Sequence, residues 1–305
     1  MLKHYRLYDL ELVSEFDLPE VPILLSTESE LNLPKVQIVA GMVPDTLEDG
    51  LLVDGWFWCS PTKALFKFEG IADFLVEEGH TITVALAKGA PESDMRMFLF
   101  GSAIGAALHQ LQLIPLHVSA VDTPFGVWAF TGDSGAGKST IAAALSRKNN
   151  WPLLCDDVAV LKSSVESPSR ICFGVNRVKL WGDAIDLLDI PKAGITKDLL
   201  RADKYHVPGT IQIDHSRDYL LNCIVQLSTS ETIEIAPLPP SQTFKTIMNC
   251  IYRPSLVHCF GDIGKVTHQI LPMAAQVRGF VFRRPRSLSR LHEGLEAVED
   301  VMKKA

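Results

Sequence analysis

The feature that most constrains the fold is one eight-residue segment, Gly132-Asp133-Ser134-Gly135-Ala136-Gly137-Lys138-Ser139. It matches the pattern Gly-x-x-x-x-Gly-Lys-Ser/Thr, and it follows an apolar run at residues 127–130 and precedes an alanine-rich run at residues 141–145. Its glycines allow the backbone to curl so that consecutive N–H groups point at phosphate oxygens. The segment, called the phosphate loop below, therefore predicts a strand, a loop and a helix of an α/β fold.

The phosphate loop also predicts how a nucleoside phosphate is held. The start of the following helix adds partial positive charge beside the loop. Lys138 is expected to reach the β and γ phosphates, and the Ser139 hydroxyl is expected to be a magnesium ligand. The alternative is a glycine-rich turn that only joins a strand to a helix, and the full pattern in this context argues against it. The predicted nucleotide-binding residues are Gly132, Asp133, Ser134, Gly135, Ala136, Gly137, Lys138, Ser139 and Thr140.

Two adjacent acids, Asp156 and Asp157, follow in the apolar run at residues 153–158. A phosphoryl-transfer site needs one carboxylate to hold magnesium, usually through water, and can use another to accept the proton of the attacking hydroxyl. Neighbouring side chains on a strand point to opposite faces, so the two acids are expected to do different jobs. A structural pair, with one acid capping a turn or pairing with a surface lysine, is the alternative. Two acids in an apolar run after a phosphate loop favour function.

The length and the local patterns set the predicted domain organisation. The chain has 305 residues, about twice the ~150 residues expected of one domain. Residues 1–92 alternate in short runs punctuated by Pro and Gly, which predicts a β-rich N-terminal module of antiparallel strands. A helix is expected to begin at residues 91–94 and to run to about residue 113. Residues 93–305 are predicted to form the catalytic domain.

Composition excludes several classes of protein. With 29 basic and 36 acidic residues, the net charge of −7 argues against a surface that binds nucleic acid or an anionic membrane. The N-terminus lacks the apolar core of a signal peptide, and the most apolar stretch is shorter than the ~20 residues of a membrane-spanning helix. The six cysteines are scattered without a Cys-x-x-Cys pair. A cytoplasmic protein with free thiols is therefore predicted.

Three segments together resemble the catalytic domain of the HPr kinase/phosphorylase family: residues 117–121 (His-Val-Ser-Ala-Val), the phosphate loop beginning Gly-Asp-Ser-Gly, and the pair Asp156-Asp157. The resemblance implies a phosphoenolpyruvate-carboxykinase-like P-loop fold with a mixed sheet, and ATP and Mg²⁺ as cofactors. It implies that Asp156 is the general base for a serine hydroxyl and that Asp157 holds metal or positions substrate. His117 is implied to lie close to the phosphate loop and the base.

The chain also departs from this family. Thr140 stands where HPr kinases usually carry Glu, and residues 171–181 lack the family's Glu-x-Arg-Gly-x-Gly segment. Neither phosphorylase activity nor recognition of HPr is therefore expected. Residues 98–103, 116–121, 177–181 and 282–285 resemble instead the HPr kinase-like proteins of peptide-modification gene clusters, notably lasso-peptide kinases.

That resemblance implies an ATP-dependent serine kinase acting on a precursor peptide, typically at its C-terminal serine. Relatives of the HPr kinase type form oligomers, so a homo-oligomer is an accompanying expectation. Two alternatives remain open from the sequence: a kinase of the same fold that acts on a small hydroxyl compound, and a nucleotide-gated binding protein without catalysis.

Four further basic residues have two possible roles. Lys204 lies in a polar stretch where a cation could cover the charge of the transferred phosphoryl group, and a solvated lysine is the alternative. The cluster Arg283, Arg284 and Arg286 could meet an acidic peptide, but a solvated face is the favoured interpretation.

Overall fold

The computed structural model describes residues 2–24, 32–162, 167–209, 211, 213–214, 217–261 and 263–304. Two compact units make up the chain. The first consists of Met1–Pro115 and Tyr252–Val266, and the second of Leu116–Ile251 and Thr267–Ala305. The predicted division at residue 92 falls inside the first unit, because the helices that follow residue 92 pack on that unit's own strands.

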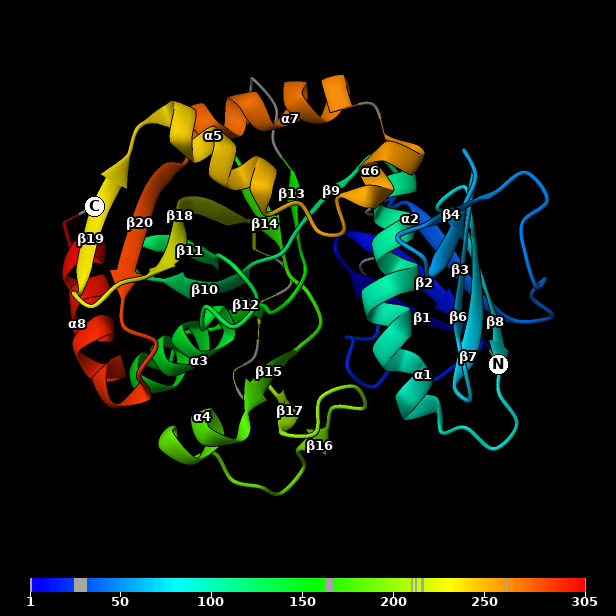
Figure 1. The fold of residues 1–305 in the computed structure, drawn as a ribbon, viewed down its shortest axis with the longest axis horizontal. Coiled ribbons are helices and arrows are strands. Elements are labelled where there is room, and N and C mark those ends of the chain that lie inside the picture. The colour runs from blue at the N-terminus through cyan, green and yellow to red at the C-terminus, as the bar shows by residue number, and fades with distance from the viewer. Residues whose placement is uncertain are drawn as a thin grey trace. The chain divides into compact units, whose positions relative to one another are not determined.

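The first unit is built on one eight-stranded sheet (Figure 1), as the short alternating runs predicted. The sheet is mixed, not purely antiparallel, because β2 and β8 both pair parallel to β3. Residues 15–34 separate β2 from β3, which is enough chain to return to the end where β2 began, as parallel pairing requires. In spatial order the strands are β1 (Lys3–Leu7), β2 (Leu10–Ser14), β3 (Lys35–Ala40), β8 (Thr81–Leu86), β7 (Ala72–Glu77), β6 (Lys63–Phe68), β5 (Phe57–Cys59) and β4 (Leu51–Val53).

The helical segment after residue 91 has three parts instead of one helix. These are α1 (Glu92–Phe98), a π-helical turn η2 (Leu99–Ala103) and α2 (Ile104–Gln110). The helix begins after Pro91, within the predicted start at residues 91–94, and has no side-chain cap. It ends before the predicted residue 113, because Gln112 adopts a positive φ of 57°. The short helix α6 (Ser255–Phe260) packs against α2.

A nine-stranded mixed sheet forms the centre of the second unit, which confirms the predicted mixed α/β architecture. The hairpin β10–β11 is antiparallel, whereas β11 and β20 flank the long strand β18 in parallel. The strands are β9 (Ile114–Leu116), which contains the boundary between the units in the sequence, β10 (Ser119–Thr123), β11 (Gly126–Thr131), β12 (Leu153–Cys155), β13 (Ala159–Lys162), β14 (Arg170–Cys172), β18 (Tyr219–Thr229), β19 (Glu234–Leu238) and β20 (Arg278–Arg284).

A separate three-stranded sheet, β15-β17-β16, lies in the same unit. Its strands are β15 (Arg177–Trp181), β16 (Thr196–Lys197) and β17 (Lys204–Pro208). Lys204, which the sequence placed in a polar stretch, is therefore the first residue of a strand.

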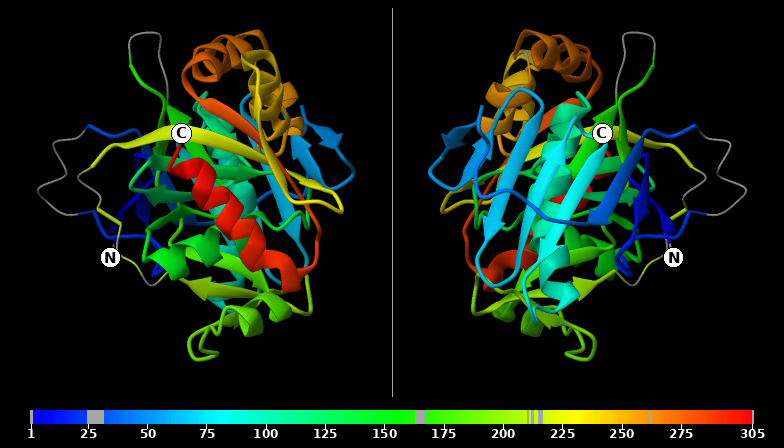
Figure 2. Two further views of the ribbon diagram at one scale, coloured as in Figure 1. Left: turned by 90° about the vertical axis from the view of Figure 1, so that its left-hand side faces the viewer. Right: turned by 90° about the vertical axis from the view of Figure 1, so that its right-hand side faces the viewer.

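Helices α3 (Lys138–Asn149) and α8 (Leu291–Met302) pack against each other and share one hydrophobic core with the large sheet. The left view of Figure 2 shows α8 in red beside α3 in green. Three consecutive alanines of α3, at positions 142–144, are buried in this core, and their small side chains permit close approach to the strands. The remaining helices are α4 (Gly182–Leu187), α5 (Pro240–Asn249), η3 (Leu288–Arg290) and α7 (Ile263–Gln276).

Two further predictions concern the chain as a whole. All six cysteines are free thiols, as predicted. Among the described residues, no helix combines the length and the apolar character needed to cross a bilayer.

Candidate active site

The phosphate loop has the predicted strand–loop–helix geometry. Strand β11 ends at Thr131 and helix α3 begins at Lys138. The three loop glycines all have positive φ, namely 142° at Gly132, 82° at Gly135 and 94° at Gly137, which glycine adopts at little cost. The sequence folds this way because each tight turn of the loop coincides with a glycine.

Lys138 is buried and lies over the loop. Its Nζ atom donates hydrogen bonds to the carbonyl oxygens of Gly132 at 2.8 Å and Asp133 at 3.2 Å. Burial lowers the pKa of the Lys138 ammonium, and the nearby Asp157 and Asp156 carboxylates offset only part of this effect. An ammonium held by neutral carbonyls beside a glycine loop is placed to receive phosphate oxygens.

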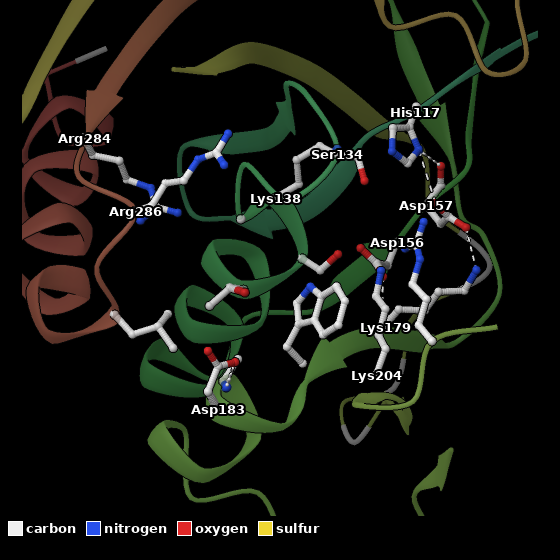
Figure 3. Close-up of a pocket in the computed structure, with 18 residues that line it drawn as sticks. His117, Ser134, Lys138, Asp156, Asp157, Lys179, Asp183, Lys204, Arg284 and Arg286 are labelled. Atoms are coloured by element: carbon white, nitrogen blue, oxygen red, sulfur yellow. Dashed lines mark hydrogen bonds and ion pairs between the residues drawn. The ribbon is translucent and has the colours of Figure 1, made fainter. Parts of the chain in front are cut away.

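One pocket opens beside the loop and collects most of the predicted residues (Figure 3). Of the predicted catalytic and substrate residues, His117, Lys138, Asp156, Asp157 and Lys204 all line it. Of the predicted nucleotide-binding run, Gly132, Asp133 and Ala136 do not. The loop residues that do line the pocket are Ser134, Gly135, Gly137, Lys138, Ser139 and Thr140.

The two acids lie at a bend and not on one strand. Strand β12 ends at Cys155 and β13 begins at Ala159, and Asp157 adopts a positive φ of 74°. The expectation that their side chains point to opposite faces is therefore wrong, and both acids line the same pocket. They nevertheless differ in their partners, so the expectation of different roles remains a prediction.

Asp156 is held by hydrogen bonds at both carboxylate oxygens. Its Oδ1 accepts from the Ser119 hydroxyl at 2.5 Å, and its Oδ2 accepts from the backbone N–H of Lys179 at 2.8 Å. Ser119 reaches the acid because β10 pairs antiparallel with β12, with Ala120 opposite Cys155. Each carboxylate oxygen has a second lone pair, so the fixed Asp156 can still accept a proton from a ligand.

Asp157 lies between two basic side chains. Its Oδ2 is 2.7 Å from Lys179 Nζ, and its Oδ1 is 3.3 Å from His117 Nδ1. Burial by itself would raise the pKa of Asp157, but the charge and the hydrogen bond of Lys179 outweigh it and hold the pKa below its usual range. Asp157 is therefore an anion at neutral pH, as a metal-holding carboxylate must be.

His117 is fixed in one tautomer by the same acid. Its Nδ1 donates to the Asp157 carbonyl oxygen at 2.9 Å, so this nitrogen carries the hydrogen. Burial lowers the pKa of His117, and the attraction of Asp157 does not fully restore it. The imidazole is therefore neutral at pH 7.

Lys179 belongs to the site and escaped the sequence prediction. It contacts both acids, one through its backbone N–H and the other through its ammonium. Val178 and Leu180 on either side of it are buried in the core, so alternation along β15 turns Lys179 toward the pocket. A basic residue between two apolar ones, shortly after the acid pair, is the signal that could have found it.

Lys204 lies on the same side of the pocket as the acids (Figure 3). Its Nζ is 5.8 Å from the centre of the Trp181 ring, a cation–π distance. Burial lowers the pKa of Lys204, and the neighbouring Arg201 lowers it further despite the attraction of Asp157. The lysine is therefore a partly desolvated cation near the acids and not a solvated one.

The arginine cluster does not form one solvated face. Arg283 is partly exposed, with 43% of its side chain accessible, and pairs with Glu234 at 3.3 Å. Arg284, in contrast, is only 7% exposed and lines the pocket, as does Arg286. The solvated interpretation is therefore wrong for Arg284, because its guanidinium turns away from solvent and donates to the carbonyl oxygen of Ala136 in the phosphate loop.

The donor chemistry of the pocket fits a nucleoside triphosphate with magnesium. Buried cations beside the loop, Lys138 and Arg284, have no carboxylate of their own within hydrogen-bond distance in the described part of the chain. Ser139 and Asp157 supply the hydroxyl and carboxylate oxygens that magnesium prefers, and nucleotide phosphates and water would complete its ligands.

Comparisons with known proteins give a distant structural likeness. No family model matches the chain, and no curated protein matches it. The structure of the Hpr(Ser) kinase/phosphatase from Coxiella burnetii matches 62% of this chain and 97% of its own, with 13% sequence identity and a TM-score of 0.30. A TM-score of this size establishes no shared function, so the function has to follow from the pocket itself.

Gly137 gives a test of the loop geometry. A Cβ atom on Gly137 would lie 2.1 Å from Arg284 Nη2, whereas a Cβ on Gly135 would meet nothing within 4 Å. Both glycines have positive φ, so an alanine at either position costs about 1–2 kcal/mol of backbone strain. Gly137→Ala must also displace Arg284 from its hydrogen bond, which adds about 1 kcal/mol.

We therefore expect Gly137→Ala to lower the free energy of unfolding more than Gly135→Ala does. Urea denaturation of both variants without nucleotide measures the difference, and Gly135→Ala serves as the matched control for strain alone. Equal losses would show that Arg284 does not occupy the space beside Gly137.

Proposed function

We propose that the second unit is an ATP- and Mg²⁺-dependent kinase that transfers a γ-phosphoryl group to a serine hydroxyl. The observation that carries this proposal is the convergence of the phosphate loop and the pair Asp156–Asp157 on one pocket. A protein that only binds nucleotide needs a loop and one metal carboxylate. A second carboxylate, fixed by two hydrogen bonds and pointing into the same pocket, supplies what transfer to a hydroxyl requires.

In this proposal each group has one role. The loop N–H groups and Lys138 hold the phosphates, and Ser139 and Asp157 hold magnesium. When bound, magnesium supplies positive charge that neutralises the phosphate oxygens. Asp156 takes the proton of the acceptor hydroxyl while the oxygen of that hydroxyl forms a bond to the γ phosphorus. The bond from that phosphorus to the β–γ bridging oxygen breaks, and the electron pair leaves with the nucleoside diphosphate.

Two lysines face the place where transfer would occur. Lys179 and Lys204 both lie beside the acids (Figure 3). Fixed cations in a partly buried pocket stabilise the charge of a phosphoryl group in transit better than mobile ones do. Neutral His117 orients Asp157 through its Nδ1 hydrogen and adds no charge to the site.

For the acceptor we propose a precursor peptide, with its C-terminal serine as the phosphorylated residue. What supports this finer assignment is the resemblance of residues 116–121 and 177–181 to lasso-peptide kinases. A cytoplasmic homo-oligomer is part of the same proposal.

The experiment is a transfer assay with radiolabelled ATP and three acceptors. These are a synthetic precursor peptide ending in serine, the same peptide ending in alanine, and free serine. We expect label on the first peptide only, because only it offers the terminal hydroxyl on a peptide. Label on free serine would assign a small-molecule kinase, and ATP binding without any labelled acceptor would overturn the kinase assignment.

A further inference from the structure

Arg284 places a buried positive charge beside the phosphate loop. It is the last residue of β20 and is 93% buried. Its Nη2 donates to the carbonyl oxygen of Ala136 at 2.9 Å and its Nη1 to that of Pro285 at 3.1 Å. Its Nε is buried and has no hydrogen-bond partner within the described ranges. Since a buried charge without a counter-charge is costly, this guanidinium calls for an anion that binds from the pocket.

A second arginine lies at the same edge. Arg286 is exposed, lines the pocket, and is anchored by a hydrogen bond from its Nε to the Thr229 hydroxyl at 3.0 Å. Burial lowers the pKa of Arg284, and the nearby charge of Arg286 lowers it further. Neighbouring like charges destabilise each other unless an anion joins them.

The position of the pair within the pocket indicates which anion. Figure 3 shows Arg284 and Arg286 on one side of Lys138, and His117, Asp156 and Asp157 on the other. In the proposed reaction the γ phosphate faces Asp156. The rest of the phosphate chain then extends toward the arginines, which is where negative charge accumulates on the departing nucleoside diphosphate.

We propose that Arg284, with Arg286 at the rim, binds the α and β phosphates of the nucleotide and stabilises the leaving nucleoside diphosphate. The inference rests on the proposed function of the pocket. A guanidinium has five N–H donors, of which the two carbonyls of Ala136 and Pro285 use two. The remaining donors suit two phosphate oxygens, which a lysine cannot contact in the same forked way.

The test measures binding of Mg·ADP by calorimetry to wild type, Arg284→Gln and Arg284→Lys. Loss of a charge-assisted contact of this kind weakens binding about tenfold or more. We expect Arg284→Gln to raise the Kd for ADP by at least about tenfold and Arg284→Lys to restore only part of the affinity. Arg283→Gln is the matched control, because Arg283 is the neighbouring residue of β20, is partly exposed, and pairs with Glu234. Its ADP affinity is expected to equal that of wild type.

The outcomes separate this inference from the proposed function. If wild type binds ADP and both Arg284 variants bind it equally well, the inference is wrong while nucleotide binding stands. If wild type itself does not bind ADP, the proposed function fails. If Arg284→Gln keeps its ADP affinity and instead raises KM for the acceptor peptide, the arginines belong to the acceptor site. Thermal unfolding of each variant without nucleotide identifies any loss of ADP affinity that comes from misfolding. If Arg284→Gln is misfolded, the ADP affinity of Arg284→Lys decides the test.

Discussion

Replacing Asp156 by asparagine is expected to lower the rate of phosphoryl transfer by about 10²- to 10⁴-fold while leaving the affinity for ATP nearly unchanged. The amide keeps the shape of the carboxylate. Its oxygen can accept from the Lys179 N–H, and its NH₂ can donate to the Ser119 hydroxyl, which accepts as well as it donates. The fold and the phosphate loop are therefore preserved, and the lost property is the ability to take up a proton.

Single-turnover transfer and ATP titration, performed on the same preparation, measure the two quantities separately. Asp186→Asn is the control, because Asp186 is an exposed acid of the same unit that pairs with Lys192. Transfer at the wild-type rate by Asp156→Asn would remove Asp156 as the general base. A parallel loss of ATP affinity would instead assign Asp156 to metal or nucleotide binding.

Replacing Lys138 by alanine is expected to weaken ATP binding about 10- to 100-fold and to lower turnover as well. The ammonium donates to two loop carbonyls, and no other residue within the described loop carries a formal positive charge. Because burial lowers the pKa of Lys138, the charged form is destabilised in the protein without ligand. The alanine variant is therefore expected to unfold no more easily than wild type when nucleotide is absent.

ATP titration and chemical denaturation together check this prediction. Lys148→Ala is the matched control, since Lys148 lies at the other end of α3 and pairs with Glu299 at 2.8 Å. An unchanged Kd for ATP in Lys138→Ala would contradict the assignment of the phosphate loop. A large loss of stability without nucleotide would show that Lys138 is mainly a structural residue.

The phosphate loop could be predicted because its geometry is local. Each positive φ falls on a glycine, and the strand and helix on either side follow from the adjacent apolar runs. The mixed sheet and the presence of Asp156 and Asp157 in the site were also accessible from the sequence. The bend between them was not, because the side-chain partners of Asp157 at this bend, Lys179 and His117, come from distant segments of the chain.

The burial of Arg284 and the unit to which residues 252–266 belong were also hard to predict, because both depend on contacts between distant segments. A run of arginines is usually solvated, and only the position of β20 beside β18 shows that Arg284 turns inward while Arg283 turns outward. Residues 252–266 join the first unit although residues 116–251 separate them from it in the sequence. Such choices depend on which surfaces meet in three dimensions, and no local pattern specifies them.

The three-stranded sheet has a consequence for how this pocket can diversify. Lys179 and Trp181 lie on β15, and Lys204 opposite Trp181 on β17, so one small sheet supplies the cations and the aromatic ring beside the acids. The phosphate loop comes from a different sheet. Under the proposed function, substitutions on this small sheet would change the surroundings of the acids without altering the strand and helix that hold the phosphate loop.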